Sequence, residues 1–389
     1  MVLARVVGVG ITPYGAYPEK TILDLIVEAG LQALTDAGLG PDEIDACYIG
    51  NFAAESFIHQ NHLGPLAGTA LGLNGIPWTH VEGACASGSL AIREGILAIK
   101  SGLYKRVLVL GVEKMTHAPT AEVTAILSRA GNSKYETRQG VTFPSAFALI
   151  AQRHMFQFGT TREQMAAVAV KNHANALHNP TAHFHKKITI EDVLTSNRLV
   201  AEPLTVLDCS PASDGAAALV LCAPEVSTDS RKVPVDITGS GLATGYAALF
   251  QNKDITSLRA AKLAAEQAYA MAGITAKDID FAEVHDCFTI AEIVATEDLG
   301  FFRAGHGGPA ALEGLTGLDG ELPVNPSGGL KAKGHPIGAT GVGQMVEAVL
   351  QLQGKAGGRQ VMGARLGLTH NLGGSGGTCT VHVLQRRDV

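Results

Sequence analysis

A cysteine within a run of small residues is the first candidate for chemistry in this chain. Cys85 lies in the run GACASG (residues 83–88), between an apolar segment and a helix-like pattern. Small neighbours leave a sulfur accessible to a substrate, and the positive end of a helix dipole favours thiolate over thiol. Buried cysteines also serve as small hydrophobic residues. The local sequence therefore allows either a nucleophile or a core residue.

Three reactive side chains follow a second apolar segment. His285, Asp286 and Cys287 come directly after the expected strand 281–284. A strand that only builds a core does not need such a trio. Asp286 could cap a helix that starts near Thr289, which would explain the aspartate but neither of the other two.

A glycine-punctuated loop carries one histidine. His335 stands between Gly334 and Pro336, ahead of a helix expected at 342–352. The pKa of imidazole suits it as the base for a thiol, although a lone histidine in a loop is more often solvated. A second glycine run, residues 373–377, precedes the strand expected at 378–384. Its N–H groups could form an oxyanion hole, but a hairpin turn would have the same sequence.

An internal repeat defines the elements that must position these residues. Residues 29–45 match residues 264–280 at a constant offset of 235, with identical residues at Ala29/Ala264, Gln32/Gln267, Ala33/Ala268, Ala37/Ala272, Gly38/Gly273, Ile44/Ile279 and Asp45/Asp280. In each copy, a Gly-rich strand (5–10; 235–241) leads to an amphipathic helix that ends at a glycine. Another strand follows (46–50; 281–284).

This alternation predicts an α/β fold whose sheet is covered by helices on both faces. We predict an N-terminal half (1–113 plus 206–230), a C-terminal half (231–389) and an inserted excursion (114–205) over the surface of the first half. Residues 227–232 are the expected linker. Reactive groups in such folds gather beyond the carboxyl ends of strands, which is where the three segments above lie.

Composition excludes several function classes. The 389 residues carry a net charge of −6 without a long basic run, which argues against a nucleic-acid partner. The six cysteines show no C-x-x-C pair, so we expect a reducing, cytoplasmic environment and neither disulfides nor a zinc ribbon. The longest apolar stretches are shorter than the roughly 20 residues of a membrane span. We also expect no metal site at His173, His178, His183 and His185, whose spacing fits no single helix face.

Taken in order, the cysteine loop, HDCF (residues 285–288), GHPIGATG (residues 334–341) and the C-terminal glycine run resemble the thiolase superfamily over the whole chain. Most thiolases carry NEAF at 285–288 and a second cysteine at the position of Asn371. Both departures resemble the sterol-carrier-protein-type and archaeal-type acetoacetyl-CoA thiolases. The resemblance implies duplicated halves in five layers, α-β-α-β-α, with an inserted loop domain.

The resemblance also implies an activity, acetyl-CoA C-acetyltransferase. Cys85, with His335 as base, would form an acyl-enzyme, and Cys287 would deprotonate a second acetyl-CoA for a Claisen condensation; the reverse reaction is thiolysis. His335 and a water held by His285 would form one oxyanion hole, and the N–H groups of Cys85 and Gly373 the other. Coenzyme A thioesters are the expected substrates, with no permanently bound cofactor. Arg129, Lys134 and Arg138 are guesses for the residues that bind the phosphates of coenzyme A.

Two alternatives stay open. One is a thiolase-like acyltransferase or aldolase acting on another coenzyme A thioester, although the aldolases generally lack the nucleophilic cysteine. The other is a channelling or scaffold subunit in a complex with HMG-CoA synthase and a small OB-fold zinc protein. The resemblance further implies a homodimer or homotetramer and a place in the isoprenoid (mevalonate) pathway.

Overall fold

Nine strands form one continuous hydrogen-bonded sheet. The computed structural model describes residues 1–226 and 233–387, so the expected linker 227–232 lies outside the described residues. The strand order is β3-β2-β4-β7-β1-β8-β11-β10-β9. The strands are β1 (Ala4–Ile11), β2 (Ala46–Gly50), β3 (Trp78–Val81), β4 (Arg106–Glu113), β7 (Gly215–Cys222), β8 (Val235–Thr244), β9 (Phe281–Glu283), β10 (Leu366–Gly373) and β11 (Thr378–Arg386).

The sheet's two halves meet where β1 pairs antiparallel with β8. A buried ion pair reinforces this junction, because Arg5 Nε of β1 lies 2.7 Å from Asp236 Oδ1 of β8. The remaining pairs on either side join strands of the same half. The sheet therefore consists of two half-sheets, one from each copy of the repeat, joined along a single strand pair.

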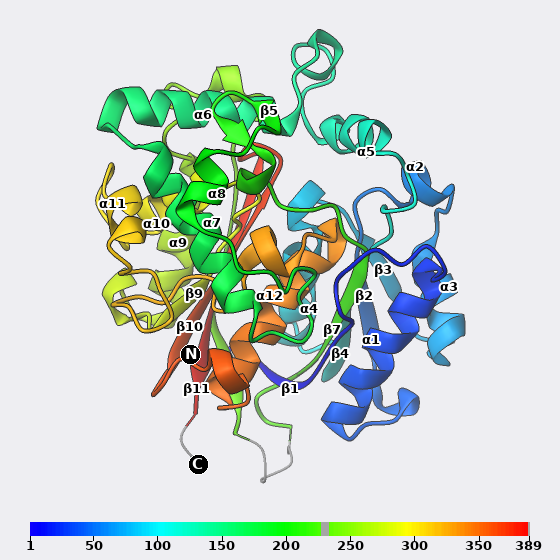
Figure 1. Ribbon diagram of the computed structural model, residues 1–389. Helices are drawn as coiled ribbons and strands as arrows, with labels where there is room; N and C mark the ends of the chain where they lie inside the picture. Colours follow the sequence, from blue (N-terminus) through cyan, green and yellow to red (C-terminus); the bar gives the residue numbers. More distant parts are fainter. Residues whose placement is uncertain (227–232, 388–389) are drawn as a thin grey trace.

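Helices complete five layers (Figure 1). The helix α1 (Ile22–Ala37) covers the outer face of the first half-sheet, and α9 (Arg259–Ala272) covers that of the second. Between the half-sheets lie α4 (Ser87–Lys100) and α12 (Ile337–Leu352); α12 contacts β4 and β7 on one side and β9, β10 and β11 on the other. The α-β-α-β-α arrangement expected from the sequence is confirmed.

The repeat has a direct packing explanation. A methyl group on Gly10 of β1 would collide with the carbonyl oxygen of Ala29 in α1, and one on Gly241 of β8 would collide with that of Ala264 in α9. Both alanines are identical positions of the repeat. Glycine on the strand and alanine on the helix let each outer helix approach its half-sheet at backbone distance.

Two polar positions of the repeat also make equivalent contacts. Gln32 Oε1 accepts a backbone N–H of β1 at 3.0 Å, and Gln267 Oε1 accepts one of β8 at 3.1 Å. Asp45 and Asp280 each accept two consecutive backbone N–H groups, at 2.7 and 2.8 Å, where β4 and β10 begin. The identical residues thus repeat the same strand–helix–strand geometry in both halves.

The excursion between β4 and β7 covers a different surface from the one expected. Its main helices, α6 and α7, pack against α10 and α11 of the second half. The expectation that it covers the first half was therefore wrong for these helices. Other parts of the excursion do contact the first half: α5 contacts α2, and Thr181 O accepts from Tyr14 N at 2.9 Å. The remaining elements are α2 (Ala54–Ile58), α3 (Leu63–Leu71), α5 (Thr120–Leu127), α6 (Phe143–Phe158), α7 (Arg162–Ala176), α8 (Ile190–Leu194), β5 (Leu199–Ala201), β6 (Leu204–Thr205), α10 (Thr289–Asp298) and α11 (Gly307–Leu312).

The close strand–helix approach predicts a specific instability. We expect Gly241→Ala to lower the free energy of unfolding by about 3 kcal/mol, because the added methyl group meets backbone rather than a movable side chain. Gly40→Ala is the matched control, since a methyl group there has open space, and its effect should stay within about 0.5 kcal/mol. Urea unfolding followed by circular dichroism measures both. Equal effects of the two substitutions would contradict this packing.

Candidate active site

Cys85 lies on a tight turn between β3 and α4. Ala84 adopts a left-handed conformation (φ 52°), which costs free energy for a residue with a side chain. The turn is held by Ser87, whose Oγ donates to Ala84 O at 2.6 Å and accepts from Gly83 N at 3.0 Å. These bonds fix the backbone that presents the Cys85 sulfur.

Close packing of the two central helices brings Cys85 towards His335. A methyl group on Gly88, in the first turn of α4, would collide with the carbonyl oxygen of Gly338, in the first turn of α12. A methyl group on Gly111 of β4 would collide with the same oxygen. Cys85 immediately precedes α4 and His335 immediately precedes α12. Glycine at these positions therefore lets the two residues meet.

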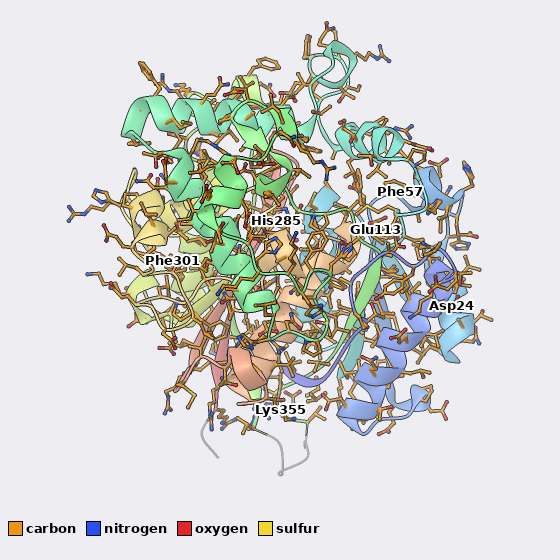
Figure 2. All side chains as sticks on the ribbon, in the orientation of Figure 1. Asp24, Phe57, Glu113, His285, Phe301 and Lys355 are labelled. Carbon is orange, nitrogen blue, oxygen red and sulfur yellow. The ribbon has the colours of Figure 1, made fainter. Side chains whose placement is uncertain are left out.

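Three of the four predicted catalytic side chains converge. One ligating atom each from Cys85, His285 and His335 lies within 4.8 Å of the other two. The two imidazole rings meet edge to face, with centroids 5.0 Å apart and an interplanar angle of 84°. His285 lies deep between the two half-sheets in Figure 2, where it follows the end of β9.

The imidazole of His335 is oriented by a threonine of its own loop. His335 Nδ1 lies 2.6 Å from Thr340 Oγ1, which donates to Pro336 O at 2.9 Å. Because the Thr340 hydroxyl donates its only proton to Pro336 O, its oxygen must accept a hydrogen bond from His335 Nδ1. The single proton of the neutral imidazole therefore lies on Nδ1, and Nε2 is unprotonated. Burial lowers the pKa of His335 to about 3. His335 is therefore a neutral base whose free nitrogen faces the cluster.

Cys85 is a thiol in the unliganded site. Burial raises its pKa to about 12, while a hydrogen bond from the backbone N–H of Gly374 acts in the opposite direction. The helix dipole, expected to favour thiolate over thiol, is outweighed by this desolvation. Cys85 is half-buried and packs against an apolar cluster of Phe57, Met115, Val123, Ile126 and Ile337. The sequence did not predict that these distant residues would lie against the cysteine.

Cys287 is buried beside the same cluster. Burial raises its pKa well above the ordinary range, and the charge of a Cys85 thiolate would raise it further. The two sulfurs therefore interact electrostatically. Cys287 is also held by its backbone, since its carbonyl oxygen accepts from Ser210 N at 2.9 Å.

Asp286 ties two functional loops together and does not cap a helix. The N-cap of α10 is Phe288, without a side-chain cap. Asp286 instead accepts the backbone N–H groups of Leu330 (2.6 Å) and Lys331 (3.2 Å) and the amide of Asn172 (2.7 Å). The capping interpretation was wrong; the carboxylate fixes the His335 loop relative to His285 and Cys287.

Glu113 is a buried carboxyl group that the sequence did not single out. It accepts N–H groups from Phe52, Ala53 and Gly338 and an amide N–H from Asn51, and burial raises its pKa to about 7. It thereby connects the end of β4 to the first turn of α12; Figure 2 labels it to the right of His285. A charged residue at the end of the apolar run 107–112 was the signal that could have found it.

The glycine run forms the hairpin turn that its sequence allowed, and one of its N–H groups lies beside Cys85. Residues 374–377 form the turn of the β10–β11 hairpin. The N–H of Gly374 reaches the Cys85 sulfur. A methyl group on Gly373 would collide with Gly83 O, so this residue also lies against the cysteine turn. The sequence identified the run but not Gly374 within it.

The sulfur and two imidazoles are also the ligands that zinc prefers. The cluster of Cys85, His285 and His335 is thus the place where a thiophilic metal could bind, and the same groups suit thiol chemistry. The histidines of the excursion have separate partners: His173 bonds Lys186 O, His183 bonds Ser213 Oγ and His185 bonds Asn179 O.

A cavity of about 380 Å³ lies behind the Cys287 segment, and its lining includes residues 209–211. Cys209 pairs with Phe288, so this wall is shared with the active site. Three cationic side chains line the cavity: Lys331, which is buried, and Lys186 and Arg198, which are exposed. Lys331 Nζ lies 3.2 Å from His173 Nε2, and burial lowers the pKa of Lys331 to about 8. Asp192 also lines the cavity, but it accepts from Thr189.

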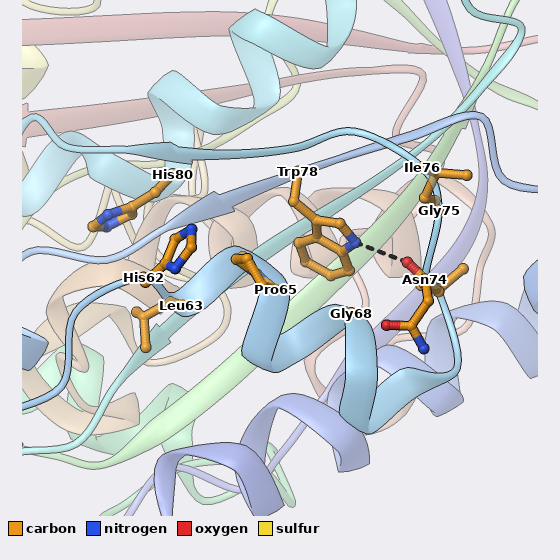
Figure 3. Close-up of a pocket in the computed structure, with 11 residues that line it drawn as sticks. His62, Leu63, Pro65, Gly68, Asn74, Gly75, Ile76, Trp78 and His80 are labelled. Carbon is orange, nitrogen blue, oxygen red and sulfur yellow. Dashed lines mark hydrogen bonds between the residues drawn. The ribbon is translucent and has the colours of Figure 1, made fainter.

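A second cavity, of about 260 Å³, lies at the outer edge of the sheet (Figure 3). Its walls come from α3 and β3, and Trp78 donates its indole N–H to Leu73 O at 3.1 Å. The guessed phosphate ligands lie elsewhere: Arg129 donates to Ser56 Oγ at 2.9 Å, and Lys134 stands over the Tyr135 ring.

Comparison with known proteins agrees with this geometry. Residues 4–225 match the family description "Thiolase, N-terminal domain", and residues 229–386 match "Thiolase C-terminal domain-like". The chain is 50% identical to the acetyl-CoA acetyltransferase of Methanothermobacter thermautotrophicus over 98% of this chain and 99% of that protein. It is 36% identical to sterol carrier protein 2 of Bos taurus over 95% of this chain and 69% of that protein.

Solved structures give the same fold. The Ltp2-ChsH2(DUF35) aldolase superposes with a TM-score of 0.86 at 25% identity, covering all of both chains. Human mitochondrial 3-ketoacyl-CoA thiolase superposes with a TM-score of 0.77 at 18% identity, again over both whole chains. Within the described residues, no helix is long and apolar enough to cross a membrane. Both halves of the chain match, and the chain belongs to the thiolase family.

Proposed function

We propose that the chain is an acetyl-CoA C-acetyltransferase that condenses two molecules of acetyl-CoA to acetoacetyl-CoA and catalyses the reverse thiolysis. The near-full-length identity of 50% to an archaeal acetyl-CoA acetyltransferase supports the substrate. The observation that carries the proposal is the convergence of Cys85, His285 and His335 within 4.8 Å at the N-terminal ends of the central helices.

In the first half-reaction, Cys85 becomes acetylated. His335 Nε2 takes the thiol proton as the sulfur attacks the acetyl carbonyl, and the C–S bond to coenzyme A breaks. The leaving thiolate takes the proton back from His335. The N–H of Gly374, which reaches the sulfur, supports an oxyanion hole at this turn, to which the sequence also assigns Cys85 and Gly373.

In the second half-reaction, Cys287 removes a proton from the methyl carbon of a second acetyl-CoA. The carbanion attacks the acetyl group on Cys85, and the Cys85 thiolate leaves. A charge on Cys85 would raise the pKa of Cys287 further. Cys287 therefore ionises only while Cys85 is uncharged, as it is in the acyl-enzyme. His285, whose ring lies edge to face with that of His335, lies where an enolate oxygen would need stabilisation.

The cationic cavity is our proposed site for the phosphates of coenzyme A. Lys186, Arg198 and Lys331 offer positive charge, and Phe184, Leu207 and Pro211 offer apolar surface. Its wall at residues 209–211 adjoins Cys287. A solved structure of human mitochondrial 3-ketoacyl-CoA thiolase contains coenzyme A, which supports binding of this ligand by the fold. Arg129, Lys134 and Arg138 do not line this cavity, and they are the other candidates for the phosphate contacts.

A lyase is the second candidate, since the aldolase named above has the same fold at 25% identity. The thiol–imidazole pair of Cys85 and His335 favours acyl transfer, because carbon–carbon cleavage alone does not need an acyl-enzyme. The aldolase assembles with a DUF35 protein, which supports a partner for this chain as well. Assembly with HMG-CoA synthase, a homo-oligomeric state, a role in isoprenoid synthesis, a cytoplasmic location and the lack of a permanent cofactor are further parts of the proposal.

The two cysteines should separate the half-reactions. Cys85→Ala should abolish acetylation of the protein by acetyl-CoA, and Cys287→Ala should still be acetylated but lose about 10³-fold in condensation, the usual contribution of a general base. Cys47→Ala, in the buried strand β2, is the control that should retain both activities. Intact-protein mass spectrometry measures acetylation, and the absorbance of acetoacetyl-CoA measures condensation. Acetylation of a cysteine in Cys85→Ala would refute the proposal.

The pKa values predict how Cys85 reactivity depends on pH. Between pH 6 and 9, Cys85 (pKa about 12) is a thiol and His335 (pKa about 3) is neutral. Acetylation by acetyl-CoA should therefore be nearly constant over this range. Alkylation by iodoacetamide requires thiolate and should rise about tenfold per pH unit, without the plateau of an ordinary cysteine near pH 9. An alkylation plateau below pH 9 would show that the thiol pKa is not raised.

The cationic cavity can be tested through KM. Arg198→Gln should raise the KM for acetyl-CoA about tenfold (about 1.4 kcal/mol) with little change in kcat. Lys277→Gln, a lysine remote from the cavity, is the charge-matched control. With acetyl-N-acetylcysteamine, a thioester without phosphates, Arg198→Gln and the native chain should perform alike. If Arg198→Gln lost activity with both thioesters, or with neither, the nucleotide of coenzyme A would bind elsewhere.

A further inference from the structure

His285, in the HDCF run, and Asn371 belong to the two departures of this chain from most thiolases, and they touch each other. Asn371 Nδ2 lies 3.1 Å from His285 Nδ1. His285 follows β9, and Asn371 lies in β10 beside the glycine turn. The two departures are therefore one physical unit. Its function depends on which atom of each side chain carries a proton.

A glutamine fixes the orientation of the asparagine amide. Gln344 Nε2, from α12, donates to the carbonyl oxygen of His370 at 3.1 Å, which points Gln344 Oε1 towards Asn371. Asn371 Nδ2 lies 3.0 Å from that oxygen. If the Asn371 amide were flipped, its oxygen would face Gln344 Oε1. If Gln344 were flipped as well, its Oε1 would face the carbonyl oxygen of His370, and both arrangements set two acceptors against each other.

The amide in turn fixes the tautomer of His285. The two protons of Asn371 Nδ2 go to Gln344 Oε1 and to His285 Nδ1, so Nδ1 is an acceptor. The imidazole is completely buried and therefore neutral at physiological pH. Its single proton lies on Nε2. His335 has the opposite arrangement, because Thr340 accepts from its Nδ1. The cluster thus contains one imidazole that donates and one that accepts.

An unsatisfied atom supports a functional reason for this arrangement. Asn371 Oδ1 is buried and has no hydrogen-bond partner among the described residues. An orphaned buried acceptor costs about 1–3 kcal/mol, which an apolar side chain of similar size would avoid. The amide is thus retained at a cost to stability, and its N–H groups are what it contributes.

We propose that Gln344 and Asn371 form a positioning relay that holds His285 as an Nε2–H donor to the enolate oxygen of the condensation step. The relay rests on the proposed function, and it assigns the donor role to His285 itself. His335 then serves acylation as base. A protonated His285 Nε2 also disfavours a metal at this cluster. A metal bound to Nε2 would force the proton to Nδ1 and so break the hydrogen bond that Asn371 donates to Nδ1.

The substitution Asn371→Asp tests the relay, because the new carboxylate has the same shape but accepts from Nδ1 and leaves Nε2 bare. At pH 8, condensation and thiolysis should fall about 10²-fold or more, as for a histidine locked in the wrong tautomer. Acetylation of Cys85 should stay within about threefold of the native rate, which also shows that the variant is folded.

The pH profile gives a signature that a merely structural role would not produce. The titratable groups that the structure places at His285 are Cys85 before α4, His335 before α12 and His370 in β10. In Asn371→Asp, protonation of the new carboxyl–imidazole pair restores the proton on Nε2. Condensation by this variant should therefore recover by about tenfold or more between pH 8 and pH 6, relative to the native chain.

Two further variants complete the test. Asn371→Ala removes the donor without adding charge and should slow condensation without recovery at pH 6. Thr369→Val, also buried in β10, removes a hydroxyl that has no partner among the described residues and should change neither half-reaction. Three results for Asn371→Asp would overturn the relay. They are equal losses in acetylation and condensation, condensation at the native rate, or a loss of condensation that does not recover at pH 6. Failure of the native chain to acetylate Cys85 would instead refute the proposed function.

Discussion

The closeness of two helix N-termini is the constraint on which the site depends. Cys85 and His335 are 250 positions apart in the sequence, and they meet because α4 and α12 touch through their backbones at Gly88 and Gly338. A methyl group on Gly88 would collide with the Gly338 carbonyl oxygen, and one on Gly338 would collide with carbonyl oxygens of β2 and β4. The five layers serve this contact, since the half-sheets enclose both helices and the outer helices cover the half-sheets. Buried hydrogen bonds from backbone N–H groups to the carboxylates of Glu113 and Asp286 then fix the loops around it.

Burial determines the chemistry of the groups that meet there. It keeps the Cys85 thiol protonated and the His335 imidazole neutral, so neither is activated by its charge. Reactivity instead comes from orientation: a proton acceptor beside the thiol and N–H groups at the sulfur. Charge then exists only during the reaction, when the site can stabilise it without first displacing water. The same burial links the two cysteines, because a charge on Cys85 would raise the pKa of Cys287 further.

The sequence predicted those parts of the fold that repeat or follow a period. Both repeat helices end at the expected glycines, Gly38 and Gly273, and β2 has the expected bounds. The convergence of Cys85, His285 and His335 was also predicted, because strand ends in α/β layers gather at one edge. Contacts between distant residues that leave no local pattern in the sequence were not predicted. The excursion packs on the second half through side chains whose partners lie far away, and Asp286 serves a distant loop instead of its own helix.

The central claim is that Cys85 carries the acyl group in a site assembled from both halves of the fold. A crystal structure of the chain frozen after exposure to acetyl-CoA tests it most directly. We expect acetyl density on Cys85 Sγ, with the carbonyl oxygen within hydrogen-bond distance of the Gly374 N–H and His335 Nε2 within one water of the sulfur. Acetyl density on another residue, or a Cys85 sulfur directed away from both imidazoles, would contradict the account.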